Sequence, residues 1–154
     1  MRRIASYVLI LAVGTFLSVA AHAEGARGTK DEAKAMVERA AAFYKENGKE
    51  KAVAEFNNPK GQFIDRDLYV FALDMQGIRV AHGTNQKLVG KSILDFKDVD
   101  GKPYGQEIVD IGKGAGTGWV DYKFTDPLTK KVGEKTTYVS RVDDIIIASG
   151  AYKQ

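Results

Sequence analysis

Three strand-like runs close the sequence, and they constrain the fold more than any other feature. The runs read GTGWVDYKF, EKTTYVSRVDD and IIIASGAYKQ, and the first turn between them passes through Asp126 and Pro127. Consecutive short strands joined by tight turns pair as an antiparallel sheet. Their Trp, Tyr, Lys and Arg side chains predict a sheet that holds a ligand rather than one that transforms it.

The part of the chain before these strands begins with helices. Apolar residues recur at spacings of three and four between Thr29 and Asn47, which predicts one long amphipathic helix. Thr29 or Asp31 can cap its start, and Gly48 stands where helices commonly end. A second, shorter helix is expected over Lys49–Phe56.

The periodicity then changes to that of strands. Leu68–Asp74 and Ile78–Ala81 flank a turn at Met75–Gly77 and predict a hairpin. We expect a turn of helix over Ser92–Phe96 and a helix over Tyr104–Lys113. The simplest packing of all these elements is an α+β fold, with an antiparallel five-stranded sheet and one long helix on a face.

The N-terminus has the pattern of a secretory signal peptide. Two arginines precede an apolar run, Tyr7–Ala20, which is followed by the small-x-small sequence AHA. The alternative is an uncleaved anchor helix, but a span needs about 20 apolar residues, and this run is shorter and interrupted. We therefore expect residues 1–23 to be a signal peptide cleaved after Ala23. Residues 24–154 would then form one periplasmic domain with no membrane span.

Charge and missing residue types exclude several functions. The chain carries a net charge of +3, and losing Arg2 and Arg3 with the signal leaves about +1, too little for a nucleic-acid surface. There is no Cys, and of the two His residues His22 leaves with the signal. A thiolate or paired-histidine metal site is thereby excluded, and a Ser-His-Asp triad would depend on His82 alone. We expect no enzyme, no cofactor, no metal site and no nucleic-acid partner.

Two motifs resemble ligand loops but have simpler interpretations. Asp98–Gly101, with Glu107 six residues further on, has part of the spacing of a calcium loop, but Phe96 stands at the first ligand position. A polar turn stabilised by aspartates is the simpler reading. Glycines 112, 114, 116 and 118 lead into a strand rather than a helix, the wrong context for a phosphate loop. We expect them to give the chain room to turn back into the sheet.

Strand alternation divides the closing strands into two faces. Trp119 shares a face with Asp121 in the first of them, and Lys135 lies on the face opposite to Tyr138 in the second. A cation and phenol hydroxyls in a cavity wall suit a small carboxylate, because charge-assisted hydrogen bonds are strong. The alternative places Lys135 and Arg141 on a solvated face, with the tyrosines as ordinary sheet aromatics. A joint role for Lys135 and Tyr138 would require a β-bulge.

His82 also has two readings, because a lone histidine is either a hydrogen-bonded structural residue or a ligand contact.

The segments that carry a wider resemblance are NG at 47–48, FNNPKGQF at 56–63, LYVF at 68–71, AHG at 81–83, LVGK at 88–91, DVDGK at 98–102, GWVDY at 118–122, KTTYV at 135–139 and GAY at 150–152. In this order, from about residue 31 to residue 152, they resemble single Cache domains, the extracytoplasmic sensing modules of bacterial chemoreceptors and histidine kinases.

The resemblance implies a PAS-like Cache fold, in which a long N-terminal helix packs on a five- to six-stranded antiparallel sheet with a ligand pocket on the other face. It implies a small organic acid as the ligand. It places Tyr69, His82, Trp119, Lys135 and Tyr138 at pocket-side positions. Members of the family usually sit between two membrane helices, whereas here a cleavable signal is expected in place of the first.

These observations together predict an exported soluble domain that binds a short-chain carboxylate in signal sensing. Lys135 would offset the charge of the ligand, Tyr69 and Tyr138 would donate hydrogen bonds, and Trp119 would exclude water. The alternative is an interaction module with a degenerate pocket, partnering a membrane chemoreceptor or a histidine kinase.

Overall fold

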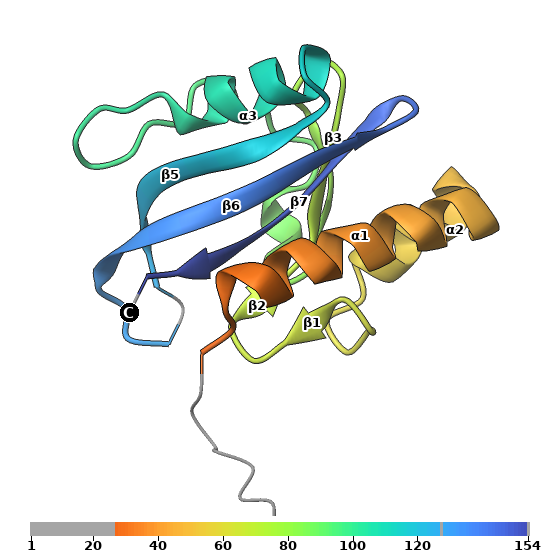
Figure 1. Ribbon diagram of the computed structural model, residues 1–154, viewed down its shortest axis with the longest axis horizontal. Helices are drawn as coiled ribbons and strands as arrows, with labels where there is room; N and C mark the ends of the chain where they lie inside the picture. The colour runs from red at the N-terminus through yellow and green to blue at the C-terminus, as the bar shows by residue number, and fades with distance from the viewer. Residues whose placement is uncertain (1–26, 127, 154) are drawn as a thin grey trace, which may run out of the picture.

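The computed structural model describes residues 27–126 and 128–153. Five strands form one antiparallel sheet in the order β4-β3-β7-β6-β5, and β1 and β2 form a separate hairpin. Figure 1 shows α3 on one side of the sheet and α1 on the other. The elements are α1 (Lys30–Asn47), α2 (Lys49–Phe56), β1 (Ile64–Asp65), β2 (Leu68–Tyr69), β3 (Phe71–Asp74), β4 (Arg79–His82), η1 (Gln86–Leu88), α3 (Tyr104–Lys113), β5 (Thr117–Thr125), β6 (Val132–Val142) and β7 (Ile145–Tyr152). The predicted α+β fold, with a long N-terminal helix on an antiparallel sheet, is confirmed.

α1 begins where the sequence supplies a complete cap. The Thr29 hydroxyl accepts a hydrogen bond from the Glu32 backbone N–H (3.2 Å), and the Glu32 carboxylate accepts one from the Thr29 N–H (2.7 Å). This reciprocal pair is a capping box. Gly48 ends the helix at φ +82°, a backbone region that glycine adopts at little cost. Between these ends, a buried stripe faces β6 and β7: Ala33, Met36, Val37, Ala40 and Tyr44.

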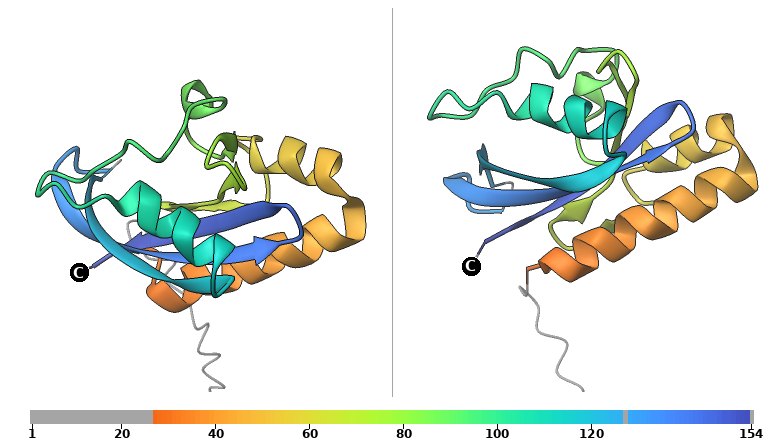
Figure 2. Two further views of the ribbon diagram at one scale, coloured as in Figure 1. Left: turned by 90° about the horizontal axis from the view of Figure 1, so that it is seen from above. Right: turned by 45° about the horizontal axis from the view of Figure 1, so that its top comes forward.

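α3 packs closely on the opposite face because its buried side carries two glycines. A methyl group at Gly112 would lie 2.4 Å from Cδ1 of Ile146, and one at Gly105 would lie 1.8 Å from the backbone oxygen of Ile93. Ile108 and Val109 complete the buried side of the helix. Figure 2 shows the helix lying directly against the sheet. Gly112 therefore allows the close approach of α3 to the sheet, and Gly105 that of α3 to the preceding loop.

Two local predictions are wrong. The run Leu68–Asp74 is two strands, because Val70 has partners outside a single ladder: its N–H donates to Phe63 O (3.2 Å), and its C=O accepts from Gly83 N–H (2.9 Å). β2 therefore pairs with β1, and β3 starts afresh at Phe71. No helix forms over Ser92–Phe96, where Ile93 N–H instead donates to Gly77 O (2.8 Å). The short helical turn lies earlier, at η1.

Alternating side chains of the sheet divide the interior into two clusters. Ile145 and Ile147 of β7 point into the cluster beneath α1, while Ile146 and Ala148 point into the cluster beneath α3. The α3-side cluster is rich in aromatic residues, among them Tyr69, Phe71, Tyr104 and Tyr122. This side of the sheet contains the cavity described below.

The loop after β4 ends in the aspartate-rich turn. Asp98 Oδ1 accepts hydrogen bonds from the N–H groups of Asp100 and Lys102 (both 2.9 Å), and Oδ2 accepts one from the N–H of Lys123 on β5 (3.0 Å). Glu107 pairs with Lys102 (3.1 Å). The interpretation of this segment as a turn stabilised by aspartate side chains is confirmed.

Candidate functional site

The α3-side cluster encloses a small cavity of about 30 Å³, which has room for one or two waters. Its lining residues are Tyr69, Phe71, Arg79, His82, Leu88, Ile93, Phe96, Tyr104, Tyr122 and Phe124. An adjoining pocket of about 250 Å³ shares Tyr69, His82, Leu88 and Phe124 with it and adds Thr84, Asn85 and Thr125. The two spaces together are the candidate site.

Arg79 supplies a buried positive charge to this site. Its side chain belongs to a residue that is 4% exposed, and Nη1 donates to Ser92 O (3.2 Å) while the guanidinium lies 4.4 Å from the centre of the Phe96 ring. Among the described residues, no carboxylate lies within 4.0 Å of it. Burial lowers the pKa of Arg79. A buried cation without a counter-charge costs free energy, so this position favours an anion.

A β-bulge brings Arg79 and His82 to the same face of the sheet. Leu73 pairs with Arg79 and Ala72 pairs with Ala81, so Val80 has no partner on β3. Without the bulge, residues three apart in a strand would point to opposite faces. Sequence reasoning missed Arg79 for this reason, since no turn residue or glycine marks the bulge.

His82 is neutral at neutral pH. Burial, together with the positive charges of Arg79 and Lys135, lowers its pKa to about 4. Nδ1 accepts a hydrogen bond from the Asn85 N–H (3.1 Å), so the ring proton resides on Nε2 and is available to a ligand. Asn57 holds the strand in place, because its Oδ1 accepts from the His82 N–H (3.0 Å).

Lys135 lies in an aromatic cage behind Tyr69. The residue is 1% exposed, and Nζ donates to Tyr69 Oη (3.1 Å). Nζ also lies 4.7 Å from the centre of the Tyr69 ring, 5.0 Å from that of Tyr152 and 5.5 Å from that of Phe124. Gly150 makes room for the side chain, since a methyl group there would lie 2.7 Å from Lys135 Cε. The alternative that placed Lys135 on a solvated face is therefore wrong.

Two aspartates near the cage partly balance the charge of Lys135. Burial lowers the pKa of Lys135, while the nearby negative charges of Asp67 and Asp126 act in the opposite direction. Both aspartates also pair with Arg27, Asp67 at 3.6 Å. Arg79 has no such neighbours, so of the two buried cations it has the greater need of an anionic partner.

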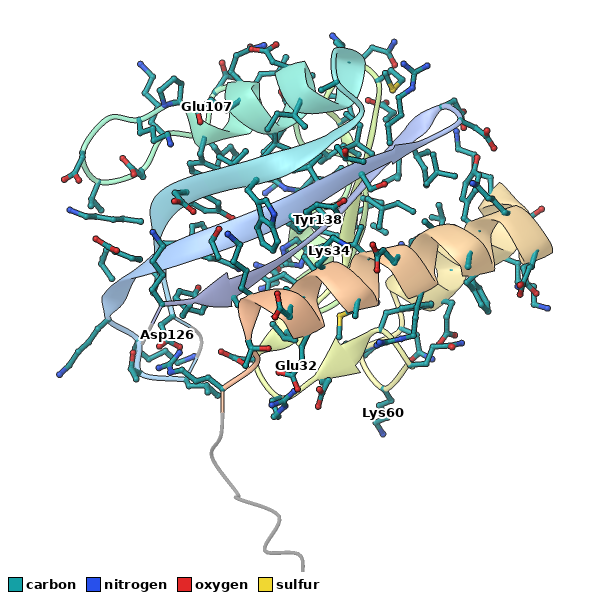
Figure 3. All side chains as sticks on the ribbon, viewed as in Figure 1. Glu32, Lys34, Lys60, Glu107, Asp126 and Tyr138 are labelled. Carbon is teal, nitrogen blue, oxygen red and sulfur yellow. The ribbon has the colours of Figure 1, made fainter. Side chains whose placement is uncertain are left out.

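Trp119 and Tyr138 lie on the opposite face of the sheet. Their rings are 5.0 Å apart; Lys30 Nζ lies 4.3 Å from the Trp119 ring, and Lys34 Nζ lies 5.5 Å from the Tyr138 ring. Figure 3 shows Tyr138 and Lys34 next to each other where α1 crosses β6. β6 pairs with β5 and β7 in one continuous register, so the bulge that a joint role with Lys135 requires is absent. The structure thus brings Tyr69, His82 and Lys135 together and leaves Trp119 and Tyr138 outside the cavity.

Tyr69 adds a neutral hydrogen-bond donor to this site. Tyr69 Oη accepts from Lys135, so its own proton is free for a ligand, and burial raises its pKa to about 12. Across residues 27–126 and 128–153, no group of three or more His, Asp or Glu side chains is arranged to hold a metal ion. Within the same ranges, none of the helices combines the length and the apolar character needed to cross a membrane.

A larger hollow of about 490 Å³ lies on the α1 face, between the start of α1 and strands β5 to β7. Its charged side chains already have partners: Lys153 pairs with Asp121 (3.2 Å), and Lys30 lies against Trp119. The smaller cavity is the better candidate because its cation has no carboxylate partner.

Solved structures with the same fold are chemosensory domains. A methyl-accepting chemotaxis protein from Vibrio parahaemolyticus is 26% identical, with a TM-score of 0.66 over 80% of this chain and 87% of that one. A Cache chemosensory domain described as recognising carboxylic acid is also 26% identical, with a TM-score of 0.62 over 80% of this chain and 88% of that one. The periplasmic sensor domain of a chemotaxis protein, 24% identical with a TM-score of 0.60, covers 80% of this chain and 90% of its own and shares the fold.

Comparison with curated proteins gives no significant match. The model of the family described as single Cache domain 2 matches residues 7–154, which includes every element of the sheet and the cavity. The chain therefore belongs to the single Cache domain family of extracytoplasmic sensory domains.

Proposed function

We propose that the chain is an exported sensory domain that binds a short-chain carboxylate in the cavity beneath α3. The observation that carries the proposal is Arg79, a buried guanidinium in the cavity wall with no carboxylate within 4.0 Å among the described residues. A bound carboxylate would provide the missing charge and two hydrogen-bond acceptors. The related Cache domain that recognises carboxylic acid supports the same ligand class.

The remaining lining groups suit a small acid. His82 offers its Nε2 proton, and Tyr69 offers its hydroxyl proton, both as neutral donors beside the guanidinium. The walls are flat and apolar, and Tyr104 and Tyr122 stack at a centroid distance of 4.1 Å. Such a space selects acids of roughly two to four carbons, since pockets bury most of the surface of their ligands.

Calorimetry with acetate, propionate, lactate and pyruvate tests this proposal. We expect Arg79→Gln to weaken binding by about ten- to a hundredfold, because a hydrogen bond to a charged group contributes more than a neutral one. Arg39→Gln is the matched control, since Arg39 is exposed on α1. Equal affinity in wild type and Arg79→Gln would remove Arg79 from the binding site.

The cellular setting belongs to the same proposal. Residues 1–23 would be a signal peptide cleaved after Ala23, although this segment lies outside the described residues, and the mature domain would be soluble in the periplasm. Its partner would be a membrane chemoreceptor or a histidine kinase. N-terminal sequencing of the protein from a periplasmic fraction tests the cleavage, and any start other than Glu24 contradicts it.

The small volume of the inner cavity favours a second candidate, a partner module whose pocket takes no ligand. A thermal-shift screen separates the two, because a ligand that binds only the folded state raises the melting temperature. A shift with a small acid supports sensing. The absence of any shift across organic acids, amino acids and purines supports the partner module.

A further inference from the structure

The turn between β5 and β6 presents apolar and cationic side chains together. Leu128 is 58% exposed and Val132 is 50% exposed, and they are two of the four exposed large hydrophobic residues of the described chain. Lys130 and Lys131 lie between them, and neither pairs with a carboxylate of the described residues within 4.0 Å. We call these four residues the hairpin tip.

The hairpin tip is held in a defined shape by Asp126. The Asp126 carboxylate accepts hydrogen bonds from the Leu128 N–H (2.8 Å) and the Thr129 hydroxyl (3.0 Å), and its backbone oxygen accepts from the Lys130 N–H (2.9 Å). The same carboxylate pairs with Arg27, so its negative charge is already balanced. Leu128 is therefore exposed on an ordered turn, and the net charge of its surroundings is positive.

We propose that the hairpin tip binds the surface of an anionic lipid bilayer. Lysines attract anionic headgroups, and exposed apolar side chains enter the boundary between headgroups and acyl chains. The charge of the tip agrees with this partner. Lys130 and Lys131 have no carboxylate within 4.0 Å among the described residues, and the Asp126 carboxylate is paired with Arg27 at the start of the described chain (Figure 3).

The interaction is weak and reversible, because the tip offers two lysines and two apolar side chains. Each basic residue near an anionic surface strengthens binding by roughly fivefold. Contact at the tip would keep a periplasmic domain close to the bilayer in which a receptor resides. This inference does not depend on the ligand cavity, which lies beneath α3.

A fluorescent probe at the tip tests the inference. The chain has no cysteine, so Leu128→Cys accepts an environment-sensitive thiol dye at one position. The full chain carrying this change is mixed with vesicles of phosphatidylglycerol and phosphatidylcholine. We expect a blue shift of the dye that is absent with phosphatidylcholine alone and disappears at high salt. Adding Lys130→Gln and Lys131→Gln should raise the lipid concentration needed by roughly 25-fold.

Val99→Cys is the matched control, because Val99 is 66% exposed but lies in the turn before α3. The dye at this position should not shift, and it reports any adsorption driven by the dye or by the N-terminal segment. No shift at position 128, or equal shifts at both positions, would overturn the inference. Equal shifts with neutral and anionic vesicles would overturn its electrostatic part. A shift with poly-glutamate but not with vesicles would assign the tip to an acidic protein partner instead.

Discussion

At the scale of single residues, a neutral histidine and a charged arginine share one wall of the cavity. They do so because Val80 has no partner on β3, which turns the side chains of Arg79 and His82 to the same side. Burial and the nearby guanidinium lower the pKa of the imidazole, so His82 stays a neutral donor where a cation would repel Arg79. Arg79 therefore supplies the positive charge of this wall, and His82 supplies a neutral hydrogen-bond donor.

The low pKa of His82 predicts a loss of stability in mild acid. The unfolded chain protonates this side chain near pH 6.5, whereas the pKa in the fold is about 4. The unfolded state therefore binds the proton more readily within this window. The contribution of His82 to the free energy of unfolding is fully present above about pH 6.5, and it falls by roughly 3 kcal/mol as the pH drops through 4. Urea unfolding of wild type and His82→Asn at pH 7 and at about pH 4.5 measures the difference.

His82→Asn keeps an acceptor for the Asn85 N–H but does not titrate, so it isolates the histidine from the carboxylates. We expect the variant to lose less stability than wild type on acidification. Parallel losses in the two proteins would show that protonation of His82 does not oppose folding.

Lys135 is expected to act through Tyr69. Lys135→Met keeps the length of the side chain but removes the donor to Tyr69 Oη and the positive charge behind it. We expect the affinity for a carboxylate to fall by about tenfold or more, with a cooperative fold retained. Calorimetry and thermal melting measure the two effects.

Lys123→Met is the matched control, because Lys123 pairs with Asp100 outside the cavity (2.7 Å). If both variants bind the acid as wild type does, Lys135 has no part in recognition.

Sequence reasoning named three residues that lie in or next to this cavity and did not find Arg79. Tyr69, His82 and Lys135 could be named because their positions match the family pattern. Arg79 depends on a bulge that is set by the pairing of β3 and β4, which no local signal reveals. Alternation correctly separates Lys135 from Tyr138. Trp119 and Tyr138, which the family pattern places on the pocket side, lie on the face of the sheet opposite to the cavity.

At the scale of elements, β5 is an edge strand whose open side is partly covered by the preceding turn. Asp98 accepts a hydrogen bond from the Lys123 N–H, and the Lys102 ammonium donates to the backbone oxygen of Asp121. Uncovered edges offer free donors and acceptors to a strand of another molecule. The aspartate-rich turn therefore protects the edge of the sheet.

Removing this cover should promote self-association. Asp98→Ala leaves the N–H groups of Lys102 and Lys123 without their partner, so we expect a lower melting temperature and concentration-dependent dimers or larger species. Analytical ultracentrifugation over a range of concentrations detects them. Asp95→Ala is the control, since Asp95 is exposed in the same loop. A monomeric Asp98→Ala protein at all concentrations would show that the turn does not guard the edge.

The packing of α3 gives a second prediction at this scale. Gly112→Ala places a methyl group 2.4 Å from Ile146 Cδ1, and overpacking of this kind costs about 1–3 kcal/mol. Without this clash, replacing glycine by alanine would stabilise the helix by about 1 kcal/mol. Urea denaturation shows whether Gly112→Ala lowers or raises the free energy of unfolding. Lys113→Ala, on the exposed side of the helix, is the control. A stabilised Gly112→Ala protein would mean that α3 does not rest on Ile146.

The helices could be placed from sequence because their signals are local. A cap at Thr29, a stop at Gly48 and the apolar periodicity of α3 are all contained in the segments themselves. The break at Val70 was not predictable, because it depends on hydrogen bonds to Phe63 and Gly83 that form only in the folded chain. The same holds for Ser92–Phe96, whose conformation is set by contact with Gly77.

At the scale of the whole molecule, the sheet separates two interiors of different character. The α1 side combines aliphatic residues with the rings of Tyr44, Phe56 and Phe63, while the α3 side combines aromatic rings with the buried cations Arg79 and Lys135. The proposed ligand site therefore lies on the face that contains the buried cations. Changes beneath α1 should alter unfolding more than affinity, and changes beneath α3 should alter both.

The ring of Tyr152 lies against two cations, Lys135 Nζ at 5.0 Å and Arg27 Cζ at 5.6 Å from its centre. Its hydroxyl donates to Thr125 O (2.8 Å). The side chain of Tyr152 therefore contacts the cage around Lys135, the first described residue and the end of β5. A force applied at either end of the described chain would therefore reach the Lys135 ammonium through one contact, the ring of Tyr152. A tether, a fusion tag or a membrane-bound neighbour attached there is therefore expected to alter the surroundings of the Lys135 ammonium, and with it the affinity for the proposed carboxylate.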